Sequence, residues 1–147
     1  MVDIGEKTPS ARTARAEGRL FVSPETVRLV RDAGLPKGNP FEVARYAGIQ
    51  AAKRTADLIP LCHSLSLDFV DVEIELGDDG FLVRSIAKCR WATGVEMEAL
   101  TAVSTACLTV YDMVKSAGKG MEIGGIRLLR KTGGKSGTYE ADPGGDR

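Results

Sequence analysis

The most strongly patterned segment of the chain is GVEMEALTAVSTACLTVYDMVK, residues 94–115. Its apolar residues recur every three to four positions, so we expect a helix from residue 95 to about residue 117, ended by Gly118 and Gly120. One face of this helix carries Ala99, Val103, Ala106, Val110 and Met113. The opposite side carries Glu98, Thr101, Thr105, Thr109, Asp112 and Lys115. A threonine-lined face with few charges indicates partial burial against a sheet, a ligand or another subunit.

Period-two alternation of apolar and polar residues predicts the strands. SLSLDFVDVEIEL, residues 64–76, alternates except at the adjacent Phe69 and Val70, where we expect a bulge or a sharp twist. Asp78-Asp79-Gly80 predicts a hairpin turn, and residues 81–91 the returning strand. Shorter apolar runs predict a first strand at residues 19–22 and a last strand at residues 121–131.

Two helix-start signals complete the expected fold. Ser23-Pro24-Glu25 begins a helix that runs to about Ala33 and ends at Gly34. Asn39-Pro40 begins another that runs to about Asp57. The order βααββαβ predicts an α+β fold, a ferredoxin-like sandwich whose antiparallel sheet carries its helices on one face, with one extra helix.

Length and composition predict a single folded domain. The 147 residues suffice for one domain with a sizeable core. Residues 1–18 are polar and mixed in charge, and we expect a flexible N-terminal arm there. Residues 19–131 form the α+β domain, and residues 132–147 are predicted to be a glycine-rich loop and tail.

Charge and cysteine usage narrow the class of protein. Twenty basic residues balance twenty acidic ones, which argues against a generic binder of nucleic acid or membranes. The N-terminus lacks the apolar core of a signal peptide, and no apolar run approaches the roughly 20 residues that span a bilayer. Three widely spaced cysteines without a C-x-x-C pair favour a reducing cytoplasm.

The chain contains one histidine, His63, and this limits the chemistry that it offers. A histidine-based zinc site needs more imidazoles, and the cysteine spacing provides no substitute. If His63 is not a general base, no Ser-His-Asp or Cys-His arrangement exists. What remains is metal-independent chemistry based on Lys, Asp and Glu side chains.

The residues alone leave the role of each candidate open. Asp112 and Lys115, three residues apart, form either a functional pair or a surface ion pair of little energetic worth. Four other candidates are equally compatible with structural or solvated roles: Lys37, Lys53, His63 and Lys131.

The glycine-rich stretch GGKS at residues 133–136 is similar to the end of a phosphate-binding P-loop. That motif needs a glycine five residues before Gly134, where this chain has Leu129, and it needs a helix to follow. We therefore do not assign a P-loop.

Four segments, in this order, resemble the cyclic pyranopterin monophosphate synthase family (molybdenum cofactor biosynthesis protein C): DLIPLCHSL, TGVEMEALTA, TVYDMVK and KTGGKSG. The likeness extends to AGIQAAKRT and to the N-terminal MVDIGEK with the R-x-A-x-A-x-G that follows it at residues 12–18, and it covers residue 1 to about residue 137. It implies a lyase that rearranges a cyclised dihydro-GTP derivative to cyclic pyranopterin monophosphate and releases diphosphate. It also implies no cofactor and no catalytic metal, and homohexamers (trimers of dimers) with sites at subunit interfaces.

The resemblance also implies roles for individual residues. The family's active-site aspartate and lysine fall on Asp112 and Lys115, which we expect to transfer protons. Lys37 and Lys131 are expected to stabilise phosphate, and Lys53 matches a further family lysine. The substrate-binding stretches match Leu61, Cys62, His63, Met97 and Glu98, together with Glu96 of the same motif. Glu96 and Glu98 are expected to hydrogen-bond the guanine-derived ring.

Two other classes of function fit a ferredoxin-like domain. A regulatory domain would bind a small molecule tightly without turnover. An RNA-binding module would need exposed aromatic side chains on central strands and a basic face. The aromatic residues Phe69, Phe81 and Trp91 instead stand among Asp68, Asp71, Glu73 and Glu75.

Overall fold

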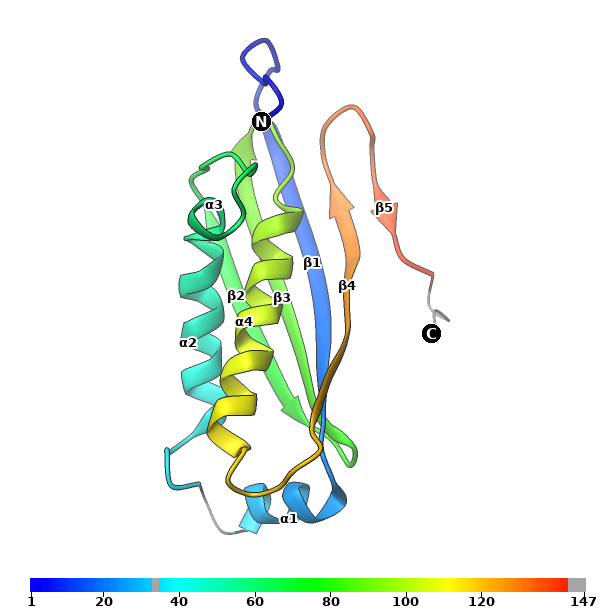
Figure 1. The fold of residues 1–147 in the computed structure, drawn as a ribbon. Helices are drawn as coiled ribbons and strands as arrows, with labels where there is room; N and C mark the ends of the chain where they lie inside the picture. Colours follow the sequence, from blue (N-terminus) through cyan, green and yellow to red (C-terminus); the bar gives the residue numbers. More distant parts are fainter. Residues whose placement is uncertain (33–34, 143–147) are drawn as a thin grey trace.

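The computed structural model describes residues 1–32 and 35–142. Within these residues one antiparallel sheet has the strand order β2-β3-β1-β4-β5. Its strands are β1 (Ser10–Phe21), β2 (Phe69–Leu76), β3 (Gly80–Trp91), β4 (Glu122–Thr132) and β5 (Tyr139–Glu140). The helices are α1 (Pro24–Asp32), α2 (Pro40–Ala52), α3 (Thr55–Leu58) and α4 (Glu96–Val114). Figure 1 shows α2 and α4 side by side on one face of the sheet, which confirms the ferredoxin-like sandwich.

The core lies between α4 and the central strands. The five apolar residues predicted to share one face of α4 are all buried. Gly48 of α2 faces α4, and a Cβ there would lie 2.8 Å from the carbonyl oxygen of Ala102. Thr101 is buried, and Thr105 and Thr109 are half-buried, so the expected partial burial of the threonine face is confirmed within one chain.

The first strand is longer than predicted, because β1 begins at Ser10 and not at residue 19. Alternate residues of its first part, Ala14, Ala16 and Gly18, are buried on the side that faces the helices. A Cβ on Gly18 would lie 2.6 Å from Cγ1 of Val103 in α4. Small residues fill this space, and they give a weak hydrophobic pattern. Residues 10–18 therefore belong to the sheet, and flexibility of the arm stays a prediction for residues 1–9.

Two other details of the prediction were wrong. The pairing of β2 with β3 runs regularly from Phe69↔Lys88 to Leu76↔Phe81, so there is no bulge at Phe69-Val70; the alternation breaks there because the strand begins there. The second helix ends at Ala52, with Lys53 as its C-cap, and the separate turn α3 follows. Thr55 is buried, and its hydroxyl donates to the carbonyl of Ala52 at 3.0 Å, which stabilises the break.

The ends of the remaining elements differ less from the prediction. Helix α4 ends at Val114, and β5 pairs Tyr139 with Lys131 inside the segment predicted as a tail. The expected end of the first helix at Ala33 and Gly34 lies outside the described residues, as do residues 143–147 of the tail. None of the helices in the described ranges is long and apolar enough to cross a membrane.

Candidate functional site

Helix α4 divides the predicted site residues into two groups, one at each of its ends. Glu96, Met97 and Glu98 lie in its first turn, whereas Asp112 and Lys115 lie at its end. Fourteen residues separate Glu98 from Asp112, which corresponds to about 21 Å along the helix axis. In Figure 1 the N-terminal segment and the loop after α3 lie near the start of α4, and the loop before α2 lies near its end.

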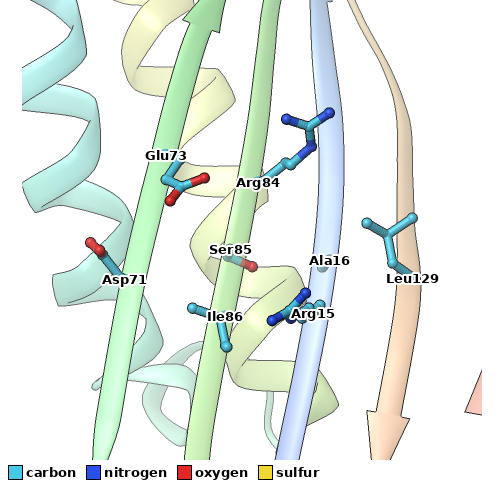
Figure 2. Close-up of a pocket in the computed structure, with 8 residues that line it drawn as sticks. All are labelled: Arg15, Ala16, Asp71, Glu73, Arg84, Ser85, Ile86 and Leu129. Atoms are coloured by element: carbon cyan, nitrogen blue, oxygen red, sulfur yellow. The ribbon is translucent and has the colours of Figure 1, made fainter.

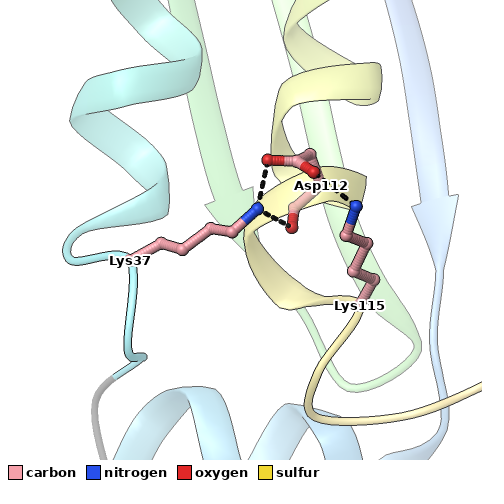
Figure 3. Close-up of polar contacts among 3 residues, drawn as sticks. All are labelled: Lys37, Asp112 and Lys115. Carbon is pink, nitrogen blue, oxygen red and sulfur yellow. Dashed lines mark hydrogen bonds and ion pairs between the residues drawn. The ribbon is translucent and has the colours of Figure 1, made fainter.

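The group at the end of α4 is an ion-paired cluster of Lys37, Asp112 and Lys115 (Figure 3). Lys37 Nζ lies 2.5 Å from Asp112 Oδ2 and also donates to the Asp112 carbonyl oxygen at 3.1 Å. Lys115 Nζ lies 2.7 Å from Asp112 Oδ1. One carboxylate thus binds two ammonium groups, each side chain remaining about half exposed.

These contacts set the charges of the cluster. Hydrogen bonds from Lys115 and then Lys37 lower the pKa of Asp112 to about 2. The hydrogen bond to Asp112 raises the pKa of Lys115. Near neutral pH, Asp112 is therefore a carboxylate that accepts hydrogen bonds, and Lys115 is an ammonium group that can donate a proton.

The local sequence places Lys37 against the end of α4. Lys37 precedes Gly38, whose φ of +90° belongs to the region that favours glycine, and the Gly38 N–H donates to the Leu35 carbonyl at 3.0 Å. Asn39 then caps α2 by accepting the N–H of Phe41 at 2.9 Å. This turn and cap position the lysine beside Asp112.

The group at the start of α4 lines a cavity of about 330 Å³. All six residues assigned to substrate binding in these two stretches contribute to its wall: Leu61, Cys62, His63, Glu96, Met97 and Glu98. Lys131 in β4 lies beside it, because its Nζ binds Glu96 Oε1 at 3.1 Å. The structure therefore brings together residues that are up to 70 positions apart in the sequence, from Leu61 to Lys131.

Two carboxylates give this cavity its polar character. Glu98 is only 4% exposed, and burial, the largest cause, together with the charge of Glu96 raises its pKa to about 7. Within the described residues neither Glu98 Oε2 nor Glu96 Oε2 has a hydrogen-bond partner. Each oxygen is a buried hydrogen-bond acceptor whose partner a ligand with N–H or O–H groups would supply.

Cys62 is a thiol rather than a thiolate in this environment. Burial raises its pKa, and the charges of Glu98 and Glu96 raise it further. Because the thiolate is the nucleophilic form, Cys62 can contact a ligand but is poorly suited to attack it.

Lys53 joins neither group in the described part of the chain. Its backbone N–H caps α2 by donating to Ile49, and its side chain is exposed. The role that the resemblance implies for Lys53 remains a prediction.

Several residues of the cavity were missed from the sequence. Val2, Ile4 and Lys7 line it, although they belong to the segment predicted as a mobile arm; the MVDIGEK likeness was the available signal. Gly94 lines it too, and a Cβ at this position would overlap the Glu96 carboxylate. Glycine at position 94 therefore leaves room for the carboxylate that faces the cavity.

A second hollow of about 310 Å³ lies on the sheet face away from α2 and α4 (Figure 2). It is lined by charged side chains such as Arg15, Glu73 and Arg84, and its Asp71 is already paired with Arg45 at 2.8 Å. The predicted site residues lie elsewhere. Phe81 is buried in the core, so this face lacks one of the aromatic side chains that an RNA-binding sheet would need.

A family model described as the MoaC family matches residues 1–134. The chain belongs to the MoaC family. Both the cavity and the ion-paired cluster lie within the matched residues.

Curated relatives support the MoaC assignment over the whole chain. The cyclic pyranopterin monophosphate synthase of Methylobacterium nodulans is 58% identical over 145 residues, which cover 97% of this chain and 91% of that protein. The protein of the same name from Parvibaculum lavamentivorans is 55% identical over 143 residues, covering 96% and 89%. A molybdenum cofactor biosynthesis bifunctional protein of Chlorobaculum tepidum is 53% identical over 143 residues, covering 97% of this chain but 46% of that protein.

Proposed function

We propose that this chain acts in molybdenum cofactor biosynthesis, where it converts (8S)-3′,8-cyclo-7,8-dihydroguanosine 5′-triphosphate to cyclic pyranopterin monophosphate and releases diphosphate. Membership of the MoaC family supports the pathway and the enzyme class. The observation that carries the proposal is the convergence of the LCH and VEME stretches on one cavity, with Lys131 bound to its carboxylate wall.

The carboxylates of the cavity suit the guanine-derived ring of this substrate. The ring presents N–H groups, and Glu96 Oε2 and Glu98 Oε2 are acceptors without a partner among residues 1–32 and 35–142. Glu98, with a pKa of about 7, is present in both protonation states near neutrality. It can therefore accept a hydrogen bond from the ring or exchange a proton with it.

The lysines suit the release of diphosphate and the transfer of a proton. A leaving diphosphate develops negative charge, which the ammonium groups of Lys37 and Lys131 would stabilise. Asp112 raises the pKa of Lys115 and so keeps it protonated near neutral pH. Lys115 is the proposed proton donor, and Asp112 holds it in place as a carboxylate.

A site formed by two copies of the chain would bring the residues at both ends of α4 to the same substrate molecule. One small molecule must reach both the carboxylates and the Lys115 ammonium group, yet about 21 Å of helix separates the two ends of α4. Because proton transfer needs heavy-atom distances near ~3 Å, we propose that the start of α4 from one chain meets the end of α4 from another. This agrees with the proposed homohexamer, a trimer of dimers with sites at subunit interfaces.

We also propose a cytoplasmic location for the enzyme. All three cysteines are free thiols, and Cys89 and Cys107 are buried. Unpaired thiols are the usual state in a reducing compartment.

The test of the proposed function is diphosphate release from the cyclised nucleotide. We expect turnover by the wild type, in EDTA as well, and a loss of roughly 10²-fold or more in kcat for Lys115→Ala and Asp112→Ala, as for removal of a general acid–base pair. Lys119→Ala is the matched control, since this exposed lysine lies just beyond the same helix, and it should keep wild-type activity. Substrate binding without turnover by the wild type would indicate a regulatory ligand-binding domain instead.

A further inference from the structure

The end of α4 contacts two segments that come earlier in the chain. Lys37, from the turn before α2, binds both the carboxylate and the carbonyl oxygen of Asp112 (Figure 3). Helix α1 lies at the same end of the molecule, beside the turn that follows α4 (Figure 1). Thr26 of α1 is buried, and it makes a hydrogen bond to this turn. The backbone around Lys115, the proposed proton donor, therefore has a second anchor besides Lys37.

Hydroxyl groups connect the start of α1 to the turn after α4. Ser23 caps α1, since its Oγ accepts the Thr26 N–H at 3.2 Å. The two hydroxyl oxygens lie 3.1 Å apart, and Thr26 Oγ1 donates to the carbonyl oxygen of Ala117 at 3.4 Å. A threonine hydroxyl has a single proton, so Ser23 donates to Thr26 and Thr26 donates to Ala117. The Thr26 hydroxyl is therefore both an acceptor and a donor in this contact.

Gly118 brings the turn directly against the same hydroxyl group. A Cβ at position 118 would lie 2.2 Å from Thr26 Oγ1, so even the methyl group of an alanine would overlap it. The Ala117 N–H donates to the Val114 carbonyl at 2.8 Å, which extends the hydrogen bonding of the last turn of α4. Ala117 thus connects the end of α4, through its N–H, to α1, through its carbonyl.

Lys115 lies in the sequence between Asp112, which Lys37 binds, and Ala117, which Thr26 binds. It is the C-cap of α4, and its Nζ lies 2.7 Å from Asp112 Oδ1. Its side chain is about half exposed, so the position of its backbone decides how well the ammonium group meets the carboxylate.

We propose that Thr26 is a positioning residue, which holds the turn after α4 in place so that Lys115 stays bound to Asp112. The inference rests on the proposed function, in which Lys115 donates a proton, and it gives a role to α1, which carries none of the predicted site residues. Proton transfer depends steeply on the distance between donor and acceptor, whereas the cavity at the start of α4 is far from Thr26. Loss of the hydroxyl should therefore lower kcat more than it raises KM.

The ionisation of Lys115 tests this role in the full-length chain without any turnover. The hydrogen bond to Asp112 is the main cause that raises the pKa of Lys115, and Tyr111 raises it further, while Lys37 binds the same carboxylate. Thr26→Val keeps the shape of the side chain and removes the hydroxyl, so the ion pair should loosen and the pKa of Lys115 should fall. NMR titration of chains with ¹³C-labelled lysine measures this pKa, and Lys115→Arg assigns its signal.

Two further variants separate the hydroxyl group from the rest of the side chain. Thr26→Ser keeps the hydroxyl, so it should keep the wild-type pKa of Lys115. Gly118→Ala leaves Thr26 unchanged but places a methyl group on its hydroxyl, so the pKa of Lys115 should fall as it does in Thr26→Val.

Thr55→Val is the matched control. Thr55 is buried like Thr26, and its hydroxyl donates to the Ala52 carbonyl at 3.0 Å, but it lies at the break after α2. This variant should lose stability and keep the wild-type pKa of Lys115. An unchanged pKa of Lys115 in both Thr26→Val and Gly118→Ala would overturn the proposal, and so would an equal fall in Thr55→Val.

Turnover assays distinguish this inference from the proposed function. Diphosphate release by Thr26→Val should show a kcat roughly tenfold lower than the wild type with little change in KM, and Thr26→Ser should restore it. A lower pKa of Lys115 in Thr26→Val, in a wild type without turnover, would support the positioning role and remove the proposed function. Turnover by the wild type, with kcat and the pKa of Lys115 unchanged in Thr26→Val, would do the reverse. If Thr26→Val does not fold, Gly118→Ala carries the same test.

Discussion

Glu98 places its carboxyl group in a cavity where burial opposes ionisation. Its pKa rises from 4.5 to about 7, so the folded chain holds this proton more tightly than the unfolded chain. The contribution of Glu98 to the free energy of unfolding is therefore most favourable at or below about pH 4.5. This contribution falls as the pH rises to about 7. Above that, the folded chain carries a constant cost for a buried charge.

Replacing Glu98 with glutamine should therefore stabilise the chain in a pH-dependent way. Glutamine keeps the shape without the charge, so Glu98→Gln should gain about 3 kcal/mol at pH 8 and about 1 kcal/mol or less at pH 5. Thermal unfolding at the two pH values measures this difference. The control Glu73→Gln, exposed on the open face of the sheet, should show no such pH dependence. An equal effect of Glu98→Gln at both pH values would contradict the assigned ionisation.

At this scale the sequence predicted the site residues through local motifs and missed those set by three-dimensional packing. The motifs around His63 and Glu98 pointed to residues that do line one cavity. Lys7 lies in a polar segment and Arg12 in a strand with little hydrophobic contrast, so the pattern alone predicts solvated side chains for both, and the N-terminal family likeness was the available signal. The structure shows their surroundings, because Lys7 lines the cavity and Arg12 lies against the turn at Gly133 and Gly134.

Strand β1 shows why element boundaries were harder to predict than element types. Alternation identified β3, apolar residues every three to four positions identified α4, and Asn39 identified the start of α2. The first half of β1 packs beneath α4 with alanine and glycine, whose small side chains give little hydrophobic contrast. The end of α2 depends on the buried hydroxyl of Thr55, a tertiary contact that no helix pattern contains.

Gly18 tests this explanation of β1. Its position leaves no room for a methyl group, since a Cβ would lie 2.6 Å from Val103 Cγ1 and 3.0 Å from Ile126 Cγ1. Gly18→Ala should destabilise the chain by about 1–3 kcal/mol, the usual cost of overpacking. Gly124→Ala is the control in β4, because the nearest atom to its Cβ would be Phe21 Cε2 at 3.4 Å, an ordinary contact. Urea unfolding measures both, and equal stability of the two variants would contradict the close packing of β1 against α4.

On the scale of the whole molecule, α4 keeps two groups of predicted site residues apart, one at each of its ends. Its start presents one buried carboxylate, Glu98, and one half-buried carboxylate, Glu96. Its end presents an exposed carboxylate with two lysines. The sequence predicted both groups of residues on one helix. At 1.5 Å per residue, this helix keeps Glu98 and Asp112 about 21 Å apart. A single chain thus has two half-sites, and symmetric assembly of identical chains is the usual way to unite such halves.

Mixing two inactive variants distinguishes a shared site from two separate ones. Lys131→Ala damages the half-site at the start of α4, and Lys115→Ala damages the one at its end. If each site takes its two halves from different chains, random co-assembly of the two variants leaves about a quarter of the sites intact. Diphosphate release should then recover to about a quarter of the wild-type rate.

If both halves act within one chain, every chain keeps one damaged half and the mixture stays inactive. Lys115→Ala mixed with Asp112→Ala is the matched control, because both substitutions damage the same half and no combination of these chains restores it.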